Sequence, residues 1–446
     1  MKKNYFKFLL VATLGFATVF SSCKKKDDET KVTPKPPSSG VEITITDDGN
    51  GIGTQTWKSE NTYILDGFCF VNNGQTLTIE PGTVIKGNTG QGENASALIV
   101  ARGGKIMAEG TVSDPIIFTA KADDLNGNIA NDVNGLWGGI IVLGKATLNA
   151  IPSTQQIEGI PTTEVRGAFG GNNDADNSGI LKYISIRHGG TDIGAGNEIN
   201  GLTLGGVGSG TTIDYIEVVA NADDGIEFFG GAANVKHALI VNCGDDSFDW
   251  DMGYHGKGQF WVSLQANYSD RHGEHDGGTD PETGTPYTLT KVYNATYIGQ
   301  NQSHTITFRD NAGGFYYNSI FINCETGIDI EFLSAGDDSY KQFQNGNLKL
   351  ENNIFYNIAG QTDATSPNLF LSAGADGGQT QDDVLAPYFT AHNTVINPGI
   401  SKTNPVPTNP QDAGQAYDDA WYDTVNYAGA FGASNWASAW TLTFKN

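Results

Sequence analysis

The stretch "NADDGIEFFGG" at residues 221–231 and the stretch "NCGDDSFDWDMG" at residues 242–253 carry acids, aromatic rings and glycines in the same order, 22 residues apart. The equivalent positions are Asp223 and Asp245, Asp224 and Asp246, Glu227 and Asp249, Phe228 and Trp250, and Gly231 and Gly253. A chain that repeats with a fixed short period returns to the same place in space once per repeat. Equivalent acids are therefore expected to lie beside one another in the folded protein.

The apolar residues before these stretches repeat with the same period. The run "IDYIEVVAN" at 213–221 aligns with "VKHALIVNC" at 235–243, and "LKYISIRHGG" at 181–190 is a third copy that precedes a loop insertion. Shorter copies follow as "NSIFINC" at 318–324 and "HNTVIN" at 392–397. A period of 22 residues is too short for a propeller blade and fits a solenoid coil of three short strands. The sequence therefore predicts an all-β solenoid whose coils stack at about 4.8 Å.

Alternation along the strands separates inward from outward side chains. It predicts inward columns at consecutive coils, formed by Ile184, Ile216 and Ala238 and by Ile186, Val218 and Ile240. Cys243 and Cys324 are expected to be small buried residues, and an odd number of cysteines after residue 23 argues against a disulfide framework. A recurring asparagine column is expected to form hydrogen-bonded turns; its members are Asn242, Asn323, Asn357 and Asn397.

The N-terminal half of the chain carries rungs of the same kind, such as "ASALIVARGGKIMAEGT", "PIIFTA" and the Trp137-Gly138-Gly139-Ile140 rung. These rungs resemble the right-handed parallel β-helix, or pectin-lyase-like, superfamily over roughly residues 41–446. The acidic block and the ending with Trp436 and Trp440 are more closely similar to Bacteroidota-type surface lipoproteins. The resemblance implies a right-handed parallel β-helix with coils of about 22 residues and loop insertions, and it leaves function open.

Three regions of the chain are expected. Residues 1–22 contain a basic start and a short apolar stretch, which is typical of a signal peptide. The small residues before Cys23 resemble a lipobox, which implies a lipidated Cys23, a Pro-rich tether over residues 23–40 and a β-helix over 41–446. The acidic run at 27–29 resembles an export signal, which implies an outer-membrane protein that faces the cell exterior.

The formal net charge of −24 excludes nucleic acid as a partner, because such a surface repels phosphates. It suits cations. In the two quoted stretches the inward positions are apolar, so Glu227 is expected to point outward beside Asp249. Glu274 and Asp276 of "HGEHDGG" extend this outward face into the next coil.

We call the repeated acids of these two coils the acidic rungs; they are Asp223, Asp224, Glu227, Asp245, Asp246, Asp249 and Asp251. Stacked carboxylates repel one another, so the acids either extend into solvent, hold protons or bind a cation. Ca²⁺ is the candidate, because it prefers six to eight oxygen ligands. Lys236 and Lys257 are alternative neutralising partners.

The acids of this face could also serve one of two catalytic roles. Polysaccharide lyases of similar fold use acid-bound Ca²⁺ with a basic residue as the proton acceptor, for which Lys257, Arg271 and Arg309 are candidates. Paired acids would instead suit a glycoside hydrolase. None of the three basic residues stands at a position that marks it as a base, so the sequence favours a binding protein over an enzyme.

Aromatic residues near the acidic rungs are candidates for stacking on a sugar. Phe229 is expected to point outward, as its equivalent Asp251 does, and Tyr254 follows the second coil. The sequence thus predicts a surface lipoprotein whose β-helix binds an extracellular glycan or an outer-membrane protein partner, with Ca²⁺ at the acidic rungs. A calcium-dependent lyase or hydrolase and a purely structural spike or adhesin remain as alternatives.

Overall fold

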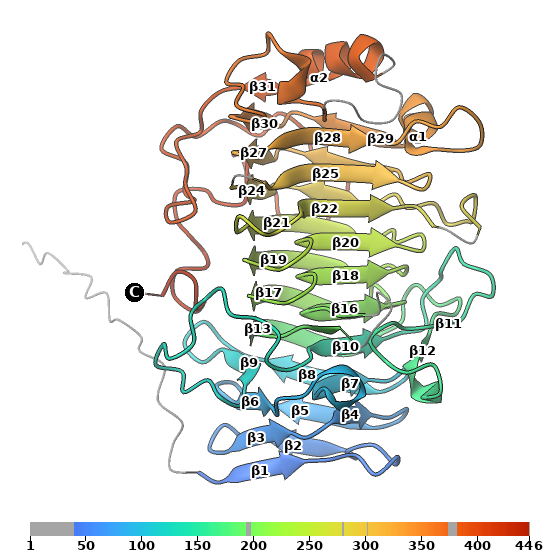
Figure 1. Ribbon diagram of the computed structural model, residues 1–446, viewed down its shortest axis with the longest axis vertical. Helices are drawn as coiled ribbons and strands as arrows, with labels where there is room; N and C mark the ends of the chain where they lie inside the picture. Colours follow the sequence, from blue (N-terminus) through green and yellow to red (C-terminus); the bar gives the residue numbers. More distant parts are fainter. Residues whose placement is uncertain (1–39, 193–197, 279–280, 301, 373–380, 446) are drawn as a thin grey trace, which may run out of the picture. The chain divides into compact units, whose positions relative to one another are not determined.

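The computed structural model describes residues 40–192, 198–278, 281–300, 302–372 and 381–445. In this part the chain forms a parallel β-helix, as the repeat predicts. Short strands of successive coils stack in register into long parallel sheets (Figure 1). Two faces of each coil belong to an 18-stranded sheet and the third to a nine-stranded sheet.

The three faces follow one another along each coil. Face 1 contains β2 (Gln55–Trp57), β5 (Thr76–Ile79), β8 (Lys105–Glu109), the first halves of β13 (Gly179–Arg187), β17 (Thr212–Val219), β19 (Asn234–Val241) and β21 (Lys257–Leu264), and then β23 (Lys291–Tyr293), β26 (Gly314–Tyr317) and β29 (Leu348–Glu351). Face 2 contains β1 (Glu42–Ile45), β3 (Thr62–Leu65), β6 (Val84–Gly87), β9 (Ile116–Ala120), the second halves of β13, β17, β19 and β21, and then β24 (Thr296–Ile298), β27 (Ile320–Ile322), β30 (Ile354–Tyr356) and β31 (Thr394–Val395).

Face 3 is the nine-stranded sheet, and it carries the acidic rungs. It contains β4 (Phe68–Val71), β7 (Ala97–Val100), β10 (Ile140–Leu143), β16 (Leu202–Gly205), β18 (Ile226–Phe229), β20 (Phe248–Asp251), β22 (Arg271–Asp276), β25 (His304–Arg309) and β28 (Thr326–Ile330). The remaining elements lie in loops: η1 (Gly92–Asn94), β11 (Gln155–Gln156), η2 (Val165–Gly167), β12 (Ala168–Phe169), β14 (Thr191–Asp192), β15 (Glu198–Ile199), α1 (Ser339–Gln344), η3 (Pro367–Leu369), η4 (Gln381–Leu385) and α2 (Ala386–His392).

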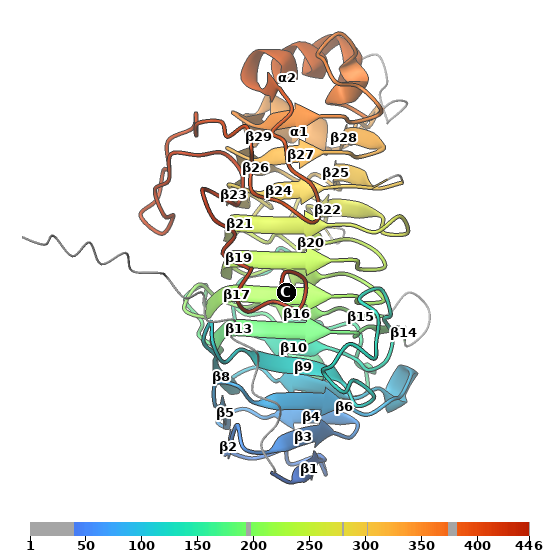
Figure 2. The same ribbon diagram turned by 90° about the vertical axis from the view of Figure 1, so that its left-hand side faces the viewer.

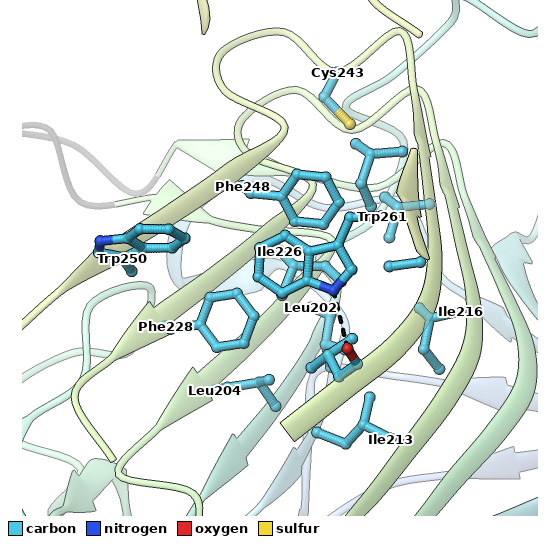
Figure 3. Packing of buried hydrophobic residues seen from close by; sticks show 14 of the residues in the cluster. Leu202, Leu204, Ile213, Ile216, Ile226, Phe228, Cys243, Phe248, Trp250 and Trp261 are labelled. Atoms are coloured by element: carbon cyan, nitrogen blue, oxygen red, sulfur yellow. Dashed lines mark hydrogen bonds between the residues drawn. The ribbon is translucent and has the colours of Figure 1, made fainter. Parts of the chain in front are cut away.

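The core confirms the predicted register. Ile216 pairs with Ile184 and with Ala238, and Val218 pairs with Ile186 and Ile240, as the two predicted columns require. All six side chains are buried in one apolar cluster inside the coils. Figure 3 shows this packing around Phe248 and Trp261, whose indole N–H donates to the carbonyl of Val235 at 3.0 Å. Cys69, Cys243 and Cys324 are buried free thiols.

A column of aromatic rings forms the corner between faces 1 and 2. Tyr183, Tyr215, His237 and Phe260 occupy it with φ of 51°, 56°, 49° and 58°. Bulky residues rarely adopt this left-handed conformation. Here the rings stack from coil to coil, with centroids 4.3, 4.1 and 4.8 Å apart, and aromatic stacking offsets part of the backbone cost.

Residues 398–445, which we call the strap, run back along the outside of this corner (Figures 1 and 2). The ring of Trp440 packs edge-on against Tyr183. The buried carboxylate of Glu217 accepts hydrogen bonds from the backbone N–H groups of Leu442 and Thr443 at 2.9 and 3.0 Å. The strap also carries acids that pair with a column of lysines on face 1; the pairs are Lys236 with Asp423, Lys257 with Asp419 and Lys291 with Asp418.

Residues 144–178, which we call the insertion, leave face 3 after β10 and cover part of its outer side. Leu148, Ile157 and Phe169 of the insertion are buried against Phe229 and the outward side chains of β7 and β10. Backbone hydrogen bonds join the insertion to the coils, for example from Gly231 to the carbonyl of Thr147 at 3.0 Å. The insertion therefore forms a wall beside the acidic rungs.

Candidate functional site

The acidic rungs lie on the outer side of face 3, where parallel pairing brings equivalent acids together. Glu227 of β18 pairs with Asp249 of β20, as the sequence predicts, and Asp249 pairs with Glu274 of β22. Side chains alternate in direction along each of these strands, so the residues immediately before and after each acid point into the core. One outward column thus presents a carboxylate at three consecutive coils.

The aspartate pairs occupy the turns that lead into these strands. The Asp224 backbone N–H donates to Oδ1 of Asn200 at 3.2 Å, and the Asp246 N–H donates to Oδ1 of Asp224 at 2.8 Å. The Arg271 N–H continues the ladder by donating to Oδ1 of Asp246 at 2.5 Å. The side chains of Asp224 and Asp246 therefore also join successive coils, because each accepts a hydrogen bond from a backbone N–H of the next coil.

Much of the acidic cluster is buried rather than solvated. Asp224, Glu227 and Asp246 are 6%, 7% and 2% exposed, whereas Asp245 is exposed. The alternative of a solvated acidic stripe is therefore wrong for the buried members. They do point away from the coil axis, but neighbouring residues cover them: Asn200 contacts Asp224 and Glu227, and Arg271 contacts Asp246.

Two acids that the sequence did not single out come from the insertion and from the β14–β15 hairpin. The carboxyl groups of Glu158, in the insertion, and Glu227 share a hydrogen bond, and Asn200 Nδ2 also donates to Glu227. Glu198 of β15 shares a hydrogen bond with the carboxyl group of Asp223. Neither residue belongs to the 22-residue repeat, so no periodic signal in the sequence could have placed it here.

Burial and like charge shift the titration of this cluster. Burial, followed by the charges of neighbouring acids, raises the pKa values of Asp224, Glu227 and Asp249 well above the usual range. Burial and the charges of Glu198 and Glu158 raise the pKa of Asp223 to about 8. Burial also raises the pKa of Glu158 to about 7. At neutral pH these groups therefore favour a proton or a bound cation over a free negative charge.

Two arginines pair with acids of the acidic face only in β22 and in the turn that precedes it. Arg309 binds Glu274 and Asp276 at 2.6 and 2.7 Å, and Arg271 binds Asp270 and also Glu274, the latter at 3.1 Å. Burial acts to lower the pKa of Arg309, but Asp276 and Glu274 outweigh it and raise that pKa above its ordinary value. Neither guanidinium is therefore poised to accept a proton.

Lys236 and Lys257, which the sequence offered as neutralising partners, do not pair with the acidic rungs. The chain turns a corner after β20, so Lys257 begins β21 on face 1, where its ammonium binds Asp419 of the strap. Lys236 likewise binds Asp423 of the strap, at 3.0 Å. The prediction that these two lysines neutralise the acidic rungs is wrong, and Lys257 does not lie among the acids where a lyase base would be needed.

Both predicted stacking residues are buried. Phe229 does point outward from its strand, but the insertion covers it and leaves the residue 7% exposed. Tyr254 is fully buried, stacks on Phe228 with centroids 4.2 Å apart and donates its hydroxyl to the carbonyl of Ala233 at 2.7 Å. The prediction that the two rings present a face to a ligand is therefore wrong.

Carboxylate oxygens converge closely enough to hold a metal ion. One atom each from Asp224, Glu227 and Asp249 lie within 4.8 Å of one another, and a neighbouring group of Asp223, Asp224 and Asp245 meets the same limit. The Oδ1 atom of Asp249 is buried and has no hydrogen-bond partner among the described residues. No described lysine, arginine or histidine forms an ion pair with Asp224, Glu227 or Asp249. This set of hard oxygen donors fits Ca²⁺.

A shallow cleft opens on the same side of the molecule, toward the N-terminal coils. It has a volume of about 320 Å³ and is lined by Phe68, Phe70, Pro161, Thr163, Glu164 and Arg166. The Arg166 guanidinium lies 3.8 Å from the centre of the Phe70 ring and binds Glu164 at 2.6 Å. Phe68 is partly exposed in this cleft, whereas Phe70 is 1% exposed beneath the guanidinium, so the cleft offers one aromatic ring and the charged pair to a ligand such as a sugar.

The repeat and the three parallel faces agree with the comparison to protein families. The model of the pectate-lyase like beta helix domain matches residues 49–393. The chain therefore belongs to the family of pectate-lyase-like β-helix domains. No curated protein and no solved structure matches the chain.

Proposed function

We propose that this protein is a lipid-anchored protein of the outer membrane, facing the cell exterior, whose β-helix binds an extracellular glycan with the help of Ca²⁺ at the acidic rungs. One observation carries the calcium part of the proposal. Asp224, Glu227 and Asp249 converge in a buried place, and Oδ1 of Asp249 has no partner there among the described residues.

Electrostatics favours a cation at this place. Two ionised carboxylates about 5 Å apart repel by about 3 kcal/mol at an effective dielectric constant of 20. Arg271 and Arg309 bind acids of the neighbouring coils and leave Glu227 and Asp224 without an ion pair among the described residues. A Ca²⁺ ion would remove the repulsion, and waters and backbone carbonyls would complete its coordination.

Two features support a glycan as the ligand. The family is described as pectate-lyase like, and pectate is a glycan. The cleft beside Phe68 and Arg166 lies on the same outer side as the acidic rungs and offers aromatic and charged contacts. The insertion covers β7 and β10, which lie between β4 and β18 in the sheet, so a ligand that contacts both places would have to pass over the insertion.

The proposed anchor rests on the sequence alone. Cys23 and the acidic run at 27–29 lie outside the described residues. Within the described residues, no helix has both the length and the apolar character needed to cross a bilayer. Attachment by lipid at Cys23 and the likeness to surface lipoproteins are parts of the proposal that the sequence alone supports. An outer-membrane protein partner remains an alternative ligand.

A glycoside hydrolase is the second candidate function. Burial raises the pKa of Glu158 to about 7, so this carboxyl group keeps its proton close to neutral pH, as a general acid requires. A lyase is less well supported because the guanidinium groups of Arg271 and Arg309 are held in ion pairs.

One experiment separates these functions. The purified chain from residue 24 onward is tested for binding to a panel of acidic and neutral polysaccharides, with Ca²⁺ or with chelator, and each mixture is then assayed for new reducing and unsaturated ends. Calcium-dependent binding without new ends supports the proposal. New reducing ends alone indicate a hydrolase, unsaturated ends indicate a lyase, and the absence of binding to any polysaccharide contradicts a glycan-binding role.

A further inference from the structure

The cleft near the N-terminal coils is formed by two segments that are far apart in the sequence. Phe68 and Phe70 belong to β4, and the other four lining residues belong to the insertion. The Nη1 atom of Arg166 binds Oδ2 of Asp47 at 2.6 Å, and this contact joins the insertion to the first coil. The buried side chain of Asp47 also accepts hydrogen bonds from the backbone N–H groups of Phe70 and Gly51, at 3.2 and 2.9 Å. The shape of the cleft is therefore fixed without a ligand, which lowers the entropic cost of binding one.

The charged groups of the cleft leave one negative charge in excess. The guanidinium of Arg166 binds Asp47 through Nη1, and it binds both carboxylate oxygens of Glu164 through Nε and Nη2, at 2.9 and 2.6 Å. No other described lysine, arginine or histidine forms an ion pair with either acid. Hydrogen bonds from Arg166 outweigh burial and lower the pKa of Glu164, so this carboxylate is ionised at neutral pH. Two carboxylates thus share one guanidinium.

The carboxylate of Glu164 keeps one free position for a hydrogen bond. Its Oε1 atom accepts from the backbone N–H and from Nε of Arg166, and its Oε2 atom accepts from Nη2. An ionised carboxylate has about four lone-pair sites, so Oε2 can accept one more hydrogen bond. Glu164 is partly exposed in the cleft, and Thr163 beside it is exposed. A ligand with hydroxyl groups can therefore donate to Glu164 and exchange a hydrogen bond with the hydroxyl of Thr163.

The partly exposed ring of Phe68 supplies the apolar contact of the cleft. An aromatic ring packs well against a flat apolar surface such as the C–H face of a sugar ring. The volume of about 320 Å³ is at the lower end of the range of small-molecule sites, about 300–1,000 Å³. The cleft thus suits one or two sugar rings of a longer chain.

We infer that the cleft binds an uncharged sugar of the glycan, with the sugar ring against Phe68 and a hydroxyl group donated to Glu164, and that it discriminates against sugars that carry a carboxylate. This inference rests on the proposed glycan-binding function and names the class of sugar at this place. A sugar carboxylate would lie beside Glu164, and Arg166 could bind it only by releasing an acid that it already holds. Because like charges without a partner repel, we expect a carboxylate on the sugar to weaken binding about tenfold.

The test measures the affinity of the purified chain for matched pairs of oligosaccharides by calorimetric titration. Each pair contains a neutral glucan, galactan or mannan oligosaccharide and the same compound oxidised to a carboxylate at C6. Titrations are run in chelator, so that a carboxylate cannot bind through Ca²⁺ at the acidic rungs, and are repeated in Ca²⁺.

Three variants accompany the wild-type chain. Glu164→Gln removes the charge and keeps an oxygen acceptor, and Phe68→Leu removes the ring and keeps an apolar side chain. Glu42→Gln makes the same chemical change as Glu164→Gln at an exposed acid of β1 and serves as the matched control.

In chelator, the wild-type chain and Glu42→Gln should bind the neutral member of at least one pair about tenfold more tightly than the acidic member. Glu164→Gln should lose this preference because binding of the acidic member becomes stronger, and Phe68→Leu should weaken binding of the neutral member. Tighter or equal binding of the acidic member by the wild-type chain would overturn the inference, and this comparison needs no variant to fold. A preference that survives in Glu164→Gln would also overturn it.

The two conditions separate a failure of this inference from a failure of the proposed function. Oligosaccharide binding that occurs in Ca²⁺ and is absent in chelator would leave glycan binding in place and would overturn the role of the cleft. Absence of binding in both conditions would contradict the glycan-binding function and the inference together.

Discussion

Replacing Asp249 by asparagine provides the sharpest test of the acidic rungs. The carboxylate atoms of Asp224, Glu227 and Asp249 lie within 4.8 Å of one another, a separation at which two full charges repel by about 3 kcal/mol at an effective dielectric constant of 20. Burial and neighbouring acids already raise the pKa of Asp249, so protonation relieves part of this repulsion near neutral pH. We therefore expect Asp249→Asn to stabilise the cation-free protein by about 1–3 kcal/mol.

The same substitution should remove most of the response to Ca²⁺. Free Ca²⁺ at a hundredfold excess over its dissociation constant stabilises the wild-type protein by about 2.7 kcal/mol, or roughly 3 °C in melting temperature for a folded domain of about 400 residues. The asparagine offers a neutral amide in place of a carboxylate, so it holds the ion weakly. The order of stability should thus change, with the variant melting above wild type in chelator and losing that advantage in Ca²⁺.

Calorimetric melting in chelator and at a series of Ca²⁺ concentrations measures both effects. Asp132→Asn makes the same change at an exposed aspartate outside the acidic rungs and should behave as wild type. If Ca²⁺ and chelator leave the wild-type melting temperature unchanged, and Asp249→Asn is neutral in both conditions, the reasoning about repulsion and calcium is refuted.

The remaining predictions concern pH, the core and the anchor. Asp223 and Glu158 have pKa values raised to about 8 and about 7, so the folded protein holds their protons more tightly than the unfolded chain does. In chelator, the melting temperature should therefore fall as pH rises from 5 to 8. A melting temperature that rises over this range would contradict the assignment. Ile240→Asp puts a carboxylate into an inward column and should cost several kcal/mol, so a soluble variant with wild-type melting would show that the register is wrong. Cys23→Ser should release the protein from membranes or leave its signal peptide uncleaved, and wild-type fractionation and processing would rule out lipidation there. Alanines at positions 27–29 should leave the protein inaccessible to external protease, and unchanged cleavage in intact cells would remove the claim of surface exposure.

The repeat predicted the features that depend on one coil lying on the next. Equivalent positions stack because every coil has the same shape, so the pairing of Glu227 with Asp249 and the inward position of Ile240 could be read from a 22-residue period. The aspartate ladder between Asp224 and Asp246 follows from the same principle. These are contacts between neighbours in a one-dimensional array.

Features that depend on the segments between repeats could not be predicted in this way. The insertion has no period, so no sequence pattern indicated that it would bury Phe229 or bring Glu158 to Glu227. Lys257 stands close to the acidic block in the sequence, but a corner of the coil separates them and places the lysine on another face. Nearness along the chain is a poor guide to nearness in space wherever the backbone turns a corner.

The strap alters how this solenoid can fold and come apart. Coils that contact only their neighbours can assemble one at a time, and they can fray from either end without disturbing distant coils. The hydrogen bond from Leu442 to Glu217 joins residues 225 positions apart, which makes it a contact of very high sequence separation, and such contacts close late because of their entropic cost. The coils can therefore form first, and the strap then links coils that share no direct contact. Opening the C-terminal coils would displace the strap, whose other end is held at β13 and β17. Unfolding is therefore expected to be a single cooperative event across the coils that the strap spans.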